Sequence, residues 1–172
     1  MVEPISFFKM NGCGNDFIVI DSRSAQVPTD LAAFTRRVCR RKMSVGADGL
    51  ILIEPSDGFD FQWQFYNSDG SRAEMCGNGA RCAARFAYEA GIAGEKMVFK
   101  TDAGPIEAEM RGEQVKLKMT PPLDCRIDFD INVSGEKRVL SSIITGVPHV
   151  VLVQTGLSDS DIVSLGRAIR YH

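Results

Sequence analysis

The chain has 172 residues, of which 44% are apolar, and its formal net charge at pH 7 is −2. The nearly balanced charge argues against a nucleic-acid or anionic-membrane partner, because such partners attract a basic surface. No apolar run approaches the roughly 20 residues of a membrane helix, and the N-terminus lacks the basic and apolar segments of a secretory signal, so we expect a cytoplasmic protein.

Short runs of β-branched and aromatic residues, separated by Gly, Pro, Asn or Asp, dominate the chain and are typical of short strands. The predicted strands cover residues 5–10, 17–21, 50–54, 61–66, 97–100, 106–110 and 115–119. The predicted helices cover residues 30–42, 80–90 and 161–170. The first has basic residues in its last turn, and the second stops at Gly91. Pro121 and Pro122 break the chain, so we expect one domain over residues 1–121 and another over residues 122–172.

Two pairs of segments resemble each other at nearly the same separation. CGNDFIVID at 13–21 resembles TGVPHVVLV at 145–153, and DLAAFTRRVCRR at 30–41 resembles DIVSLGRAIRYH at 161–172. Two matches at nearly the same separation predict a duplicated lobe. The counterpart of Cys76 in the second lobe would then lie beyond His172, so we expect this chain to be the front part of a longer protein.

The stretch YNSDGSRAEMCGNGARC at 66–82 places Cys76 where a glycine-rich loop opens a predicted helix. The free N–H groups and the dipole of a helix N-terminus favour an anion, so we expect a thiolate on this cysteine. The amides of Gly77, Asn78 and Gly79 could hold a carboxylate beside it. The alternative is a simple turn that buries Cys76 as a small apolar residue.

A thiolate beside a bound carboxylate suits nucleophilic attack on a carbonyl or removal of the proton next to the carboxylate. Nucleophilic cysteines usually need a histidine base, and the chain has His149 and the terminal His172. Proton removal by the cysteine itself fits better. Two lobes that present thiols to opposite faces of one carbon would invert its configuration by general acid–base catalysis.

The remaining cysteines fit neither a zinc site nor a disulfide framework, because their number is odd and no CxxC pair occurs. Cys39 and Cys82 are expected in the core, and Cys125 is expected to have no role. Cys13 could approach the site, but it lies on the same lobe as Cys76 and would reach the same face of a substrate. We expect reduced thiols, no metal and no cofactor.

The blocks FFKMNGCGNDFIVID, GADGLI, YNSDGSRAEMCGNGARC and TGVPHVV, in this order, resemble the diaminopimelate epimerase family, whose wider relatives include proline racemase and phenazine-pathway isomerases. The resemblance implies cofactor-free interconversion of LL- and meso-diaminopimelate in lysine and cell-wall biosynthesis. It also implies an α+β fold of two pseudo-symmetric lobes, each a mainly antiparallel sheet wrapped around a central helix, with the first lobe complete here and the second only begun. The expected partner is a small amino-acid substrate, with a second copy of the chain as a further candidate.

Carried over position by position, the resemblance implies catalytic roles for Cys76 and His149. Residues matched to substrate binding are Asn11, Asn67, Gly77 and Asn78. Gly49 and Val147 stand where some relatives carry glutamine and asparagine, so no side-chain contact carries over there.

The second catalytic cysteine and its Glu-Arg partner motif are absent from the chain, so we expect the isolated chain to have little or no epimerase activity. Two alternatives remain open at this stage. One is a racemase or isomerase of another amino acid in the same superfamily, and the other is a non-catalytic module that binds carboxylates.

Overall fold

The computed structural model describes residues 4–172, which form two compact units, with the boundary in the sequence between Thr120 and Pro121. The first unit contains the elements β1 Phe8–Gly12, β2 Asn15–Asp21, α1 Leu31–Val38, β3 Gly49–Glu54, β4 Phe61–Asn67, α2 Gly77–Glu89, β5 Lys96–Thr101, β6 Gly104–Arg111 and β7 Gln114–Lys118. Within the described residues of this unit, seven strands form one sheet in chain order from β1 to β7. Neighbouring strands are antiparallel except for β2–β3 and β4–β5, and each parallel pair is joined through a helix, as parallel connections require.

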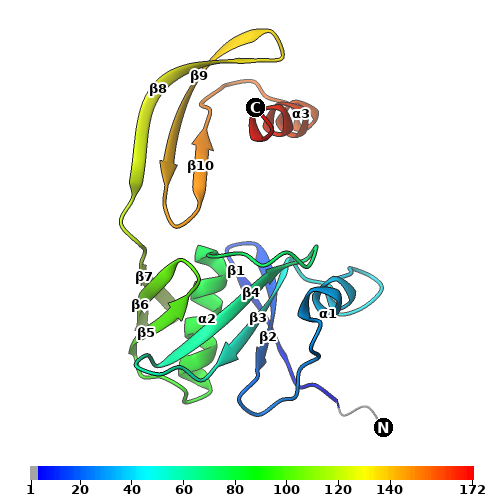
Figure 1. The fold of residues 1–172 in the computed structure, drawn as a ribbon, viewed down its shortest axis with the longest axis vertical. Coiled ribbons are helices and arrows are strands. Elements are labelled where there is room, and N and C mark those ends of the chain that lie inside the picture. The colour runs from blue at the N-terminus through cyan, green and yellow to red at the C-terminus, as the bar shows by residue number, and fades with distance from the viewer. Residues whose placement is uncertain (1–3) are drawn as a thin grey trace. The chain divides into compact units, whose positions relative to one another are not determined.

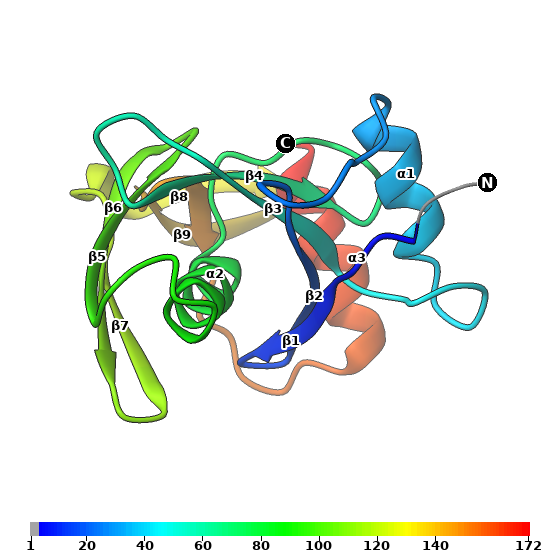
Figure 2. The ribbon, with the colours of Figure 1, turned by 90° about the horizontal axis from the view of Figure 1, so that it is seen from below.

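The sheet curls around α2, which contacts β1, β2, β3, β6 and β7 (Figures 1 and 2). Small residues make this close packing possible. A methyl group at Gly79 would lie 3.3 Å from Cδ1 of Ile51 and 3.5 Å from Cζ3 of Trp63. The space between the helix and the sheet at this point therefore leaves little room for a side chain larger than that of glycine. Further along α2, most of the buried residues are alanines, whose small side chains allow the same close approach of the helix to the sheet.

Strand β3, with the sequence GLILIE, is buried over nearly its whole length because both of its faces are covered. On one face, Leu50 and Leu52 pack with residues of β2 against Leu31 and Phe34 of α1. On the other face, Ile51 approaches α2. The continuous apolar run in the sequence therefore reflects a central strand between two helices.

The second unit contains β8 Leu123–Val133, β9 Glu136–Ile144, β10 Pro148–Val151 and α3 Asp159–Arg170. The strands form an antiparallel sheet in the order β10–β9–β8. Helix α3 begins with a capping box, in which Ser158 and Asp161 each bond the other's backbone amide. No helix in the part of the chain from residue 4 onward has both the length and the apolar character needed to cross a membrane.

The mixed fold with a curled, mainly antiparallel sheet confirms the predicted fold class, while several element boundaries differ. The first strand begins at Phe8 instead of at residue 5. The first helix ends at Val38 instead of at residue 42, because the chain then folds back and the amide of Gly46 donates to the Val38 carbonyl at 2.9 Å. Lys42, in this reversal, has a φ of 66° that no helix residue can adopt. The third helix begins two residues earlier than predicted, at Asp159 after the Ser158 cap.

Candidate active site

Cys76 caps the N-terminus of α2. Its backbone is extended (φ −148°, ψ 116°), and its Sγ accepts a hydrogen bond from the amide of Gly79 at 3.4 Å. The sulfur thus occupies the place usually taken by the oxygen of a capping serine or aspartate. The residue is half-buried, so the position combines contact with the positive end of the helix and access from outside.

The amides that follow Cys76 differ in their availability. Gly77 and Asn78 are the first two helical residues, and residues at these positions have no carbonyl within the helix to which they can donate. The amide of Gly79 is instead used by the sulfur. Of the three amides expected to hold a carboxylate, those of Gly77 and Asn78 therefore remain available, and that of Gly79 does not.

The side chain of Asn78 is held from two sides. Its Nδ2 donates to Oδ1 of Asn15 at 2.6 Å, and its Oδ1 accepts a hydrogen bond from Arg81. Arg81 also donates to Sγ of Cys13 at 3.5 Å. Sequence reasoning missed Asn15 as a site residue, since nothing local shows that it meets a helix 63 positions later in the chain.

Asn11 lies in β1, just before the turn to β2. Its Oδ1 accepts a hydrogen bond from the amide of Gly14 at 3.2 Å, which leaves its Nδ2 as the group available for a ligand. The turn packs directly on α2, because a methyl group at Gly12 would lie 2.7 Å from the carbonyl oxygen of Asn78. Asn11 is thereby fixed near the first turn of α2.

Asn67 is the last residue of β4, and its Nδ2 donates to Oγ of Ser71 at 3.0 Å. Asp69 accepts hydrogen bonds from the hydroxyl of Ser71 at 2.6 Å and from its amide at 2.8 Å. These bonds hold the pKa of the Asp69 carboxyl below its usual value. The bonded turn orients Asn67 so that its Oδ1 is the group left to accept from a ligand.

His149 lies in β10 of the second unit and is exposed. Its Nδ1 lies 2.8 Å from the carbonyl oxygen of Val147 and 3.2 Å from Oγ1 of Thr145. A carbonyl can only accept, so Nδ1 carries a proton and Nε2 is the acceptor nitrogen of the neutral ring. In this way Val147 fixes the tautomer of His149 through its backbone, although its side chain offers no hydrogen bond.

The other cysteines fall into two groups. Cys39 and Cys82 are buried, and burial raises the pKa of each thiol to about 11. Cys13 and Cys125 are exposed. Neither buried thiol is placed to exchange protons with a ligand.

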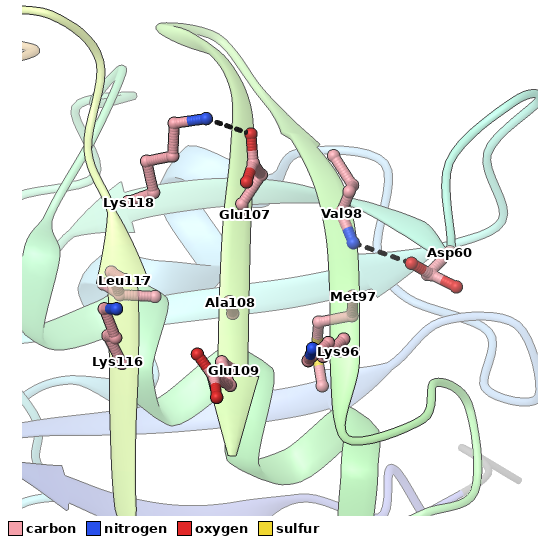
Figure 3. Close-up of a pocket in the computed structure, with 10 residues that line it drawn as sticks. All are labelled: Asp60, Lys96, Met97, Val98, Glu107, Ala108, Glu109, Lys116, Leu117 and Lys118. Carbon is pink, nitrogen blue, oxygen red and sulfur yellow. Dashed lines mark hydrogen bonds and ion pairs between the residues drawn. The ribbon is translucent and has the colours of Figure 1, made fainter. Parts of the chain in front are cut away.

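A separate hollow of about 530 Å³ lies on the outer face of β5, β6 and β7 (Figure 3). Several of its charged side chains already have partners: Lys118 pairs with Glu107 at 2.6 Å, and Asp60 accepts from the amide of Val98 at 2.7 Å. None of the residues implied by the family resemblance lines it. We therefore place the candidate site at Cys76 and treat this face as a solvated surface.

The fold is shared with amino-acid epimerases and racemases of known structure. The crystal structure of a hydroxyproline epimerase from Agrobacterium vitis matches 94% of this chain and 56% of that one, with a TM-score of 0.70 and 18% identity. A probable proline racemase from Agrobacterium radiobacter K84 matches 96% of this chain and 57% of that one, also with a TM-score of 0.70 and 18% identity. At this identity the likeness defines the fold alone.

Sequence similarity defines the family more closely. The family model described as diaminopimelate epimerase matches residues 7–123. The diaminopimelate epimerase of Aquifex aeolicus (strain VF5) is 47% identical over 179 residues, covering 98% of this chain and 64% of the relative. That of Hydrogenobaculum sp. (strain Y04AAS1) is 44% identical and covers 95% and 64%. The chain belongs to the diaminopimelate epimerase family, which confirms the resemblance, and it spans 64% of the length of these relatives.

Proposed function

We propose that this chain takes part in the cofactor-independent epimerisation of LL-diaminopimelate to meso-diaminopimelate, with Cys76 as one of two proton carriers. The observation that carries the proposal is the half-buried sulfur at the N-terminus of α2, next to two backbone amides without helical partners. The helix dipole and the Gly79 amide, which donates to Sγ at 3.4 Å, both direct positive charge toward this sulfur. The names of the relatives support the choice of substrate.

In the proposed reaction, the Cys76 thiolate removes the proton from the α-carbon of the substrate and becomes a thiol. The electron pair left on the carbon spreads into the α-carboxylate, whose negative charge grows. The amides of Gly77 and Asn78 donate to that carboxylate, and a preorganised donor of this kind is worth roughly 10²–10³ in rate. A thiol on the opposite face donates a proton to the α-carbon and becomes a thiolate. The configuration of the carbon is thereby inverted, and one proton has been taken up by one sulfur and released by the other.

Asn11 and Asn67 are proposed to bind the polar ends of the substrate. Asn11 offers an Nδ2 donor and Asn67 an Oδ1 acceptor, neither of which has a hydrogen-bond partner among residues 4–172, because the other half of each amide is the one bonded within its own turn. This pair of opposite groups suits a substrate that carries both carboxylate and ammonium groups. His149, with Nε2 as acceptor, is proposed to assist proton transfer.

The test is proton exchange by the complete gene product in D₂O with LL-diaminopimelate, followed by ¹H NMR of the α-proton. Cys76→Ser should slow exchange at least about 100-fold, since a positioned acid–base group contributes 10²–10⁴. Cys125→Ser, which changes an exposed thiol in β8, is the matched control and should leave the rate unchanged. Full exchange activity in Cys76→Ser would refute the proposal.

Two other functions predict different results in the same assay. A racemase of another amino acid should exchange the α-proton of proline or hydroxyproline, the substrates in the names of the fold relatives, faster than that of diaminopimelate. A non-catalytic carboxylate-binding module should bind diaminopimelate in calorimetry without any exchange.

We also propose a cytoplasmic location, because the reaction needs a reduced Cys76 and reducing compartments keep thiols free. Cell fractionation tests this, and recovery in a periplasmic fraction would contradict it.

We further propose assembly as a homodimer, because Phe7 and Phe8 are exposed where the edge strand β1 begins. Light scattering of the complete gene product should give twice the monomer mass, and a monomer mass would contradict it.

A further inference from the structure

We propose that Asp48 is a positioning residue of the Cys76 site, acting through Asn15 on the first turn of α2 and through Ser68 on the turn that contains Asn67. Asp48 directly precedes β3, and within residues 4–172 none of its hydrogen bonds goes to a residue assigned above to catalysis or substrate binding. The geometric part of this inference stands alone, and its catalytic part rests on the proposed function.

The Asp48 carboxylate sets the orientation of two asparagine side chains in sequence. Its Oδ2 accepts a hydrogen bond from Nδ2 of Asn15 at 3.2 Å. A carboxylate only accepts, so Asn15 must turn its NH₂ group toward Asp48 and its oxygen away. That oxygen accepts from Nδ2 of Asn78 at 2.6 Å. The orientation of Asn78, beside Cys76, is therefore set from one side by the carboxylate of Asp48 through Asn15, and from the other side by Arg81.

The backbone of Asp48 joins two further parts of the site. Its amide donates to the carbonyl of Asp16 at 2.8 Å, and its carbonyl accepts from the amide of Ser68 at 2.9 Å. The next residue, Gly49, lies opposite Asn67 in the β3–β4 register. Asp48 thus connects the start of β2 with the turn after β4.

Arg41 holds Asp48 and Asp16 together. Its Nη2 donates to Oδ1 of Asp48 at 2.8 Å, and its Nη1 donates to Oδ2 of Asp16 at 3.0 Å. Lys9 adds a second cation, 3.1 Å from Asp16. These cations hold the pKa of the Asp16 carboxyl far below its usual value. Two neighbouring carboxylates would otherwise repel each other, so Arg41 allows Asp48 to approach Asn15.

An amide at position 48 cannot replace the carboxylate. Oδ2 of Asp48 accepts from Asn15 and from the Asp16 amide, while Oδ1 accepts from Arg41. Whichever way a substituted amide turned, its NH₂ group would face a donor. The Asp48 side chain is 39% exposed, so its ion pair contributes little to stability. We therefore expect Asp48→Asn to fold and to disturb the orientation of Asn78.

The first measurement is the side-chain amide signals of Asn15 and Asn78 in ¹H–¹⁵N NMR spectra of the chain without ligand. Asp48→Asn should shift both pairs of signals. The matched control is Asp21→Asn, which removes another arginine-paired carboxylate at the opposite end of β2, where Arg23 donates at 2.8 Å. The control should leave both pairs in place.

The second measurement is α-proton exchange of diaminopimelate by the complete gene product. Asp48→Asn should lower kcat/KM at least about tenfold, because small displacements of positioning groups are costly. Asn15→Ala should do the same, and the double variant should lose no more than either single variant, since both changes break one connection. This non-additivity separates positioning through Asn15 from a general loss of structure.

Unchanged Asn78 signals in Asp48→Asn, or a double variant whose loss equals the product of the single losses, would overturn the inference. If Asp48→Asn does not fold, Asp48→Glu is the second variant, because it keeps a carboxylate that can only accept but moves it by one methylene, and it must still shift the Asn78 signals. Failure of the proposed function gives a different pattern. The wild-type protein would then exchange no diaminopimelate proton, while the shifts in the ligand-free spectra would remain.

Discussion

The contact between the β1–β2 turn and α2 predicts that Gly12→Ala destabilises the first unit. The backbone of Gly12 belongs to the extended strand β1, so alanine meets no conformational barrier there. Its methyl group, however, would lie 2.7 Å from the carbonyl oxygen of Asn78 and 3.1 Å from Sγ of Cys82. Ordinary contacts begin at 3.4 Å, so the turn and the helix must separate by about 0.7 Å.

Overpacking of this kind typically costs about 1–3 kcal/mol. Separation should also stretch the Asn15–Asn78 hydrogen bond, which is 2.6 Å long. Urea unfolding followed by the fluorescence of the single tryptophan, Trp63, reports on this unit. The free energy of unfolding should fall by about 1–3 kcal/mol, and the side-chain amide signals of Asn78 should shift.

The control is Gly94→Ala, where the methyl group would meet nothing closer than the Lys96 carbonyl at 4.0 Å. Its unfolding free energy should stay within about 0.5 kcal/mol of the wild type or rise slightly, because alanine restricts the unfolded chain more than glycine does. Equal stability of the Gly12 and Gly94 variants would show that the turn does not press on α2, and the reasoning would fail.

Three further outcomes follow from burial and charge. The Asp16 pKa is depressed in the folded state, so the stability from its pairing is present above about pH 4 and is lost as the pH falls. In Arg41→Gln, the free energy of unfolding should therefore fall less than in the wild type as the pH is lowered from about 5 to about 3. An acid titration of fluorescence that matches the wild type would contradict this. The buried Cys39, with a pKa of about 11, should react with iodoacetamide at about pH 8 at least about tenfold more slowly than the exposed thiols in peptide mass spectra, and equal rates would refute its burial. Phe99→Ala should cost about 3–5 kcal/mol in urea unfolding, whereas Val98→Ala on the outer face should cost under about 0.5 kcal/mol, and similar costs would contradict the assigned faces of β5.

Much of the first unit could be predicted from sequence because local patterns and tertiary packing agree there. The glycines and alanines from Gly77 onward serve both the start of α2 and its fit inside the sheet. The position of Cys76 at the helix N-terminus followed from the same pattern. In such segments each residue has one role that its neighbours reinforce.

The rest depended on contacts that no local pattern contains. Strands β8 and β9 were missed, since aspartates such as Asp128 and Asp130 are uncommon in strands and the pairing of β8 is irregular. The bonds of Asn15 with Asp48 and Asn78 join positions 33 and 63 residues apart. A sequence shows that these side chains are polar, but only the folded sheet and helix bring them together.

The order of strands in the large sheet bears on how the protein is made. Each strand from β2 to β7 pairs with the strand that precedes it in the chain. During synthesis on the ribosome, every new strand therefore finds its partner already outside the exit tunnel, and long searches for distant partners are avoided. The growing edge of the sheet is covered by the next segment to emerge, which limits the time in which it can aggregate with other nascent chains.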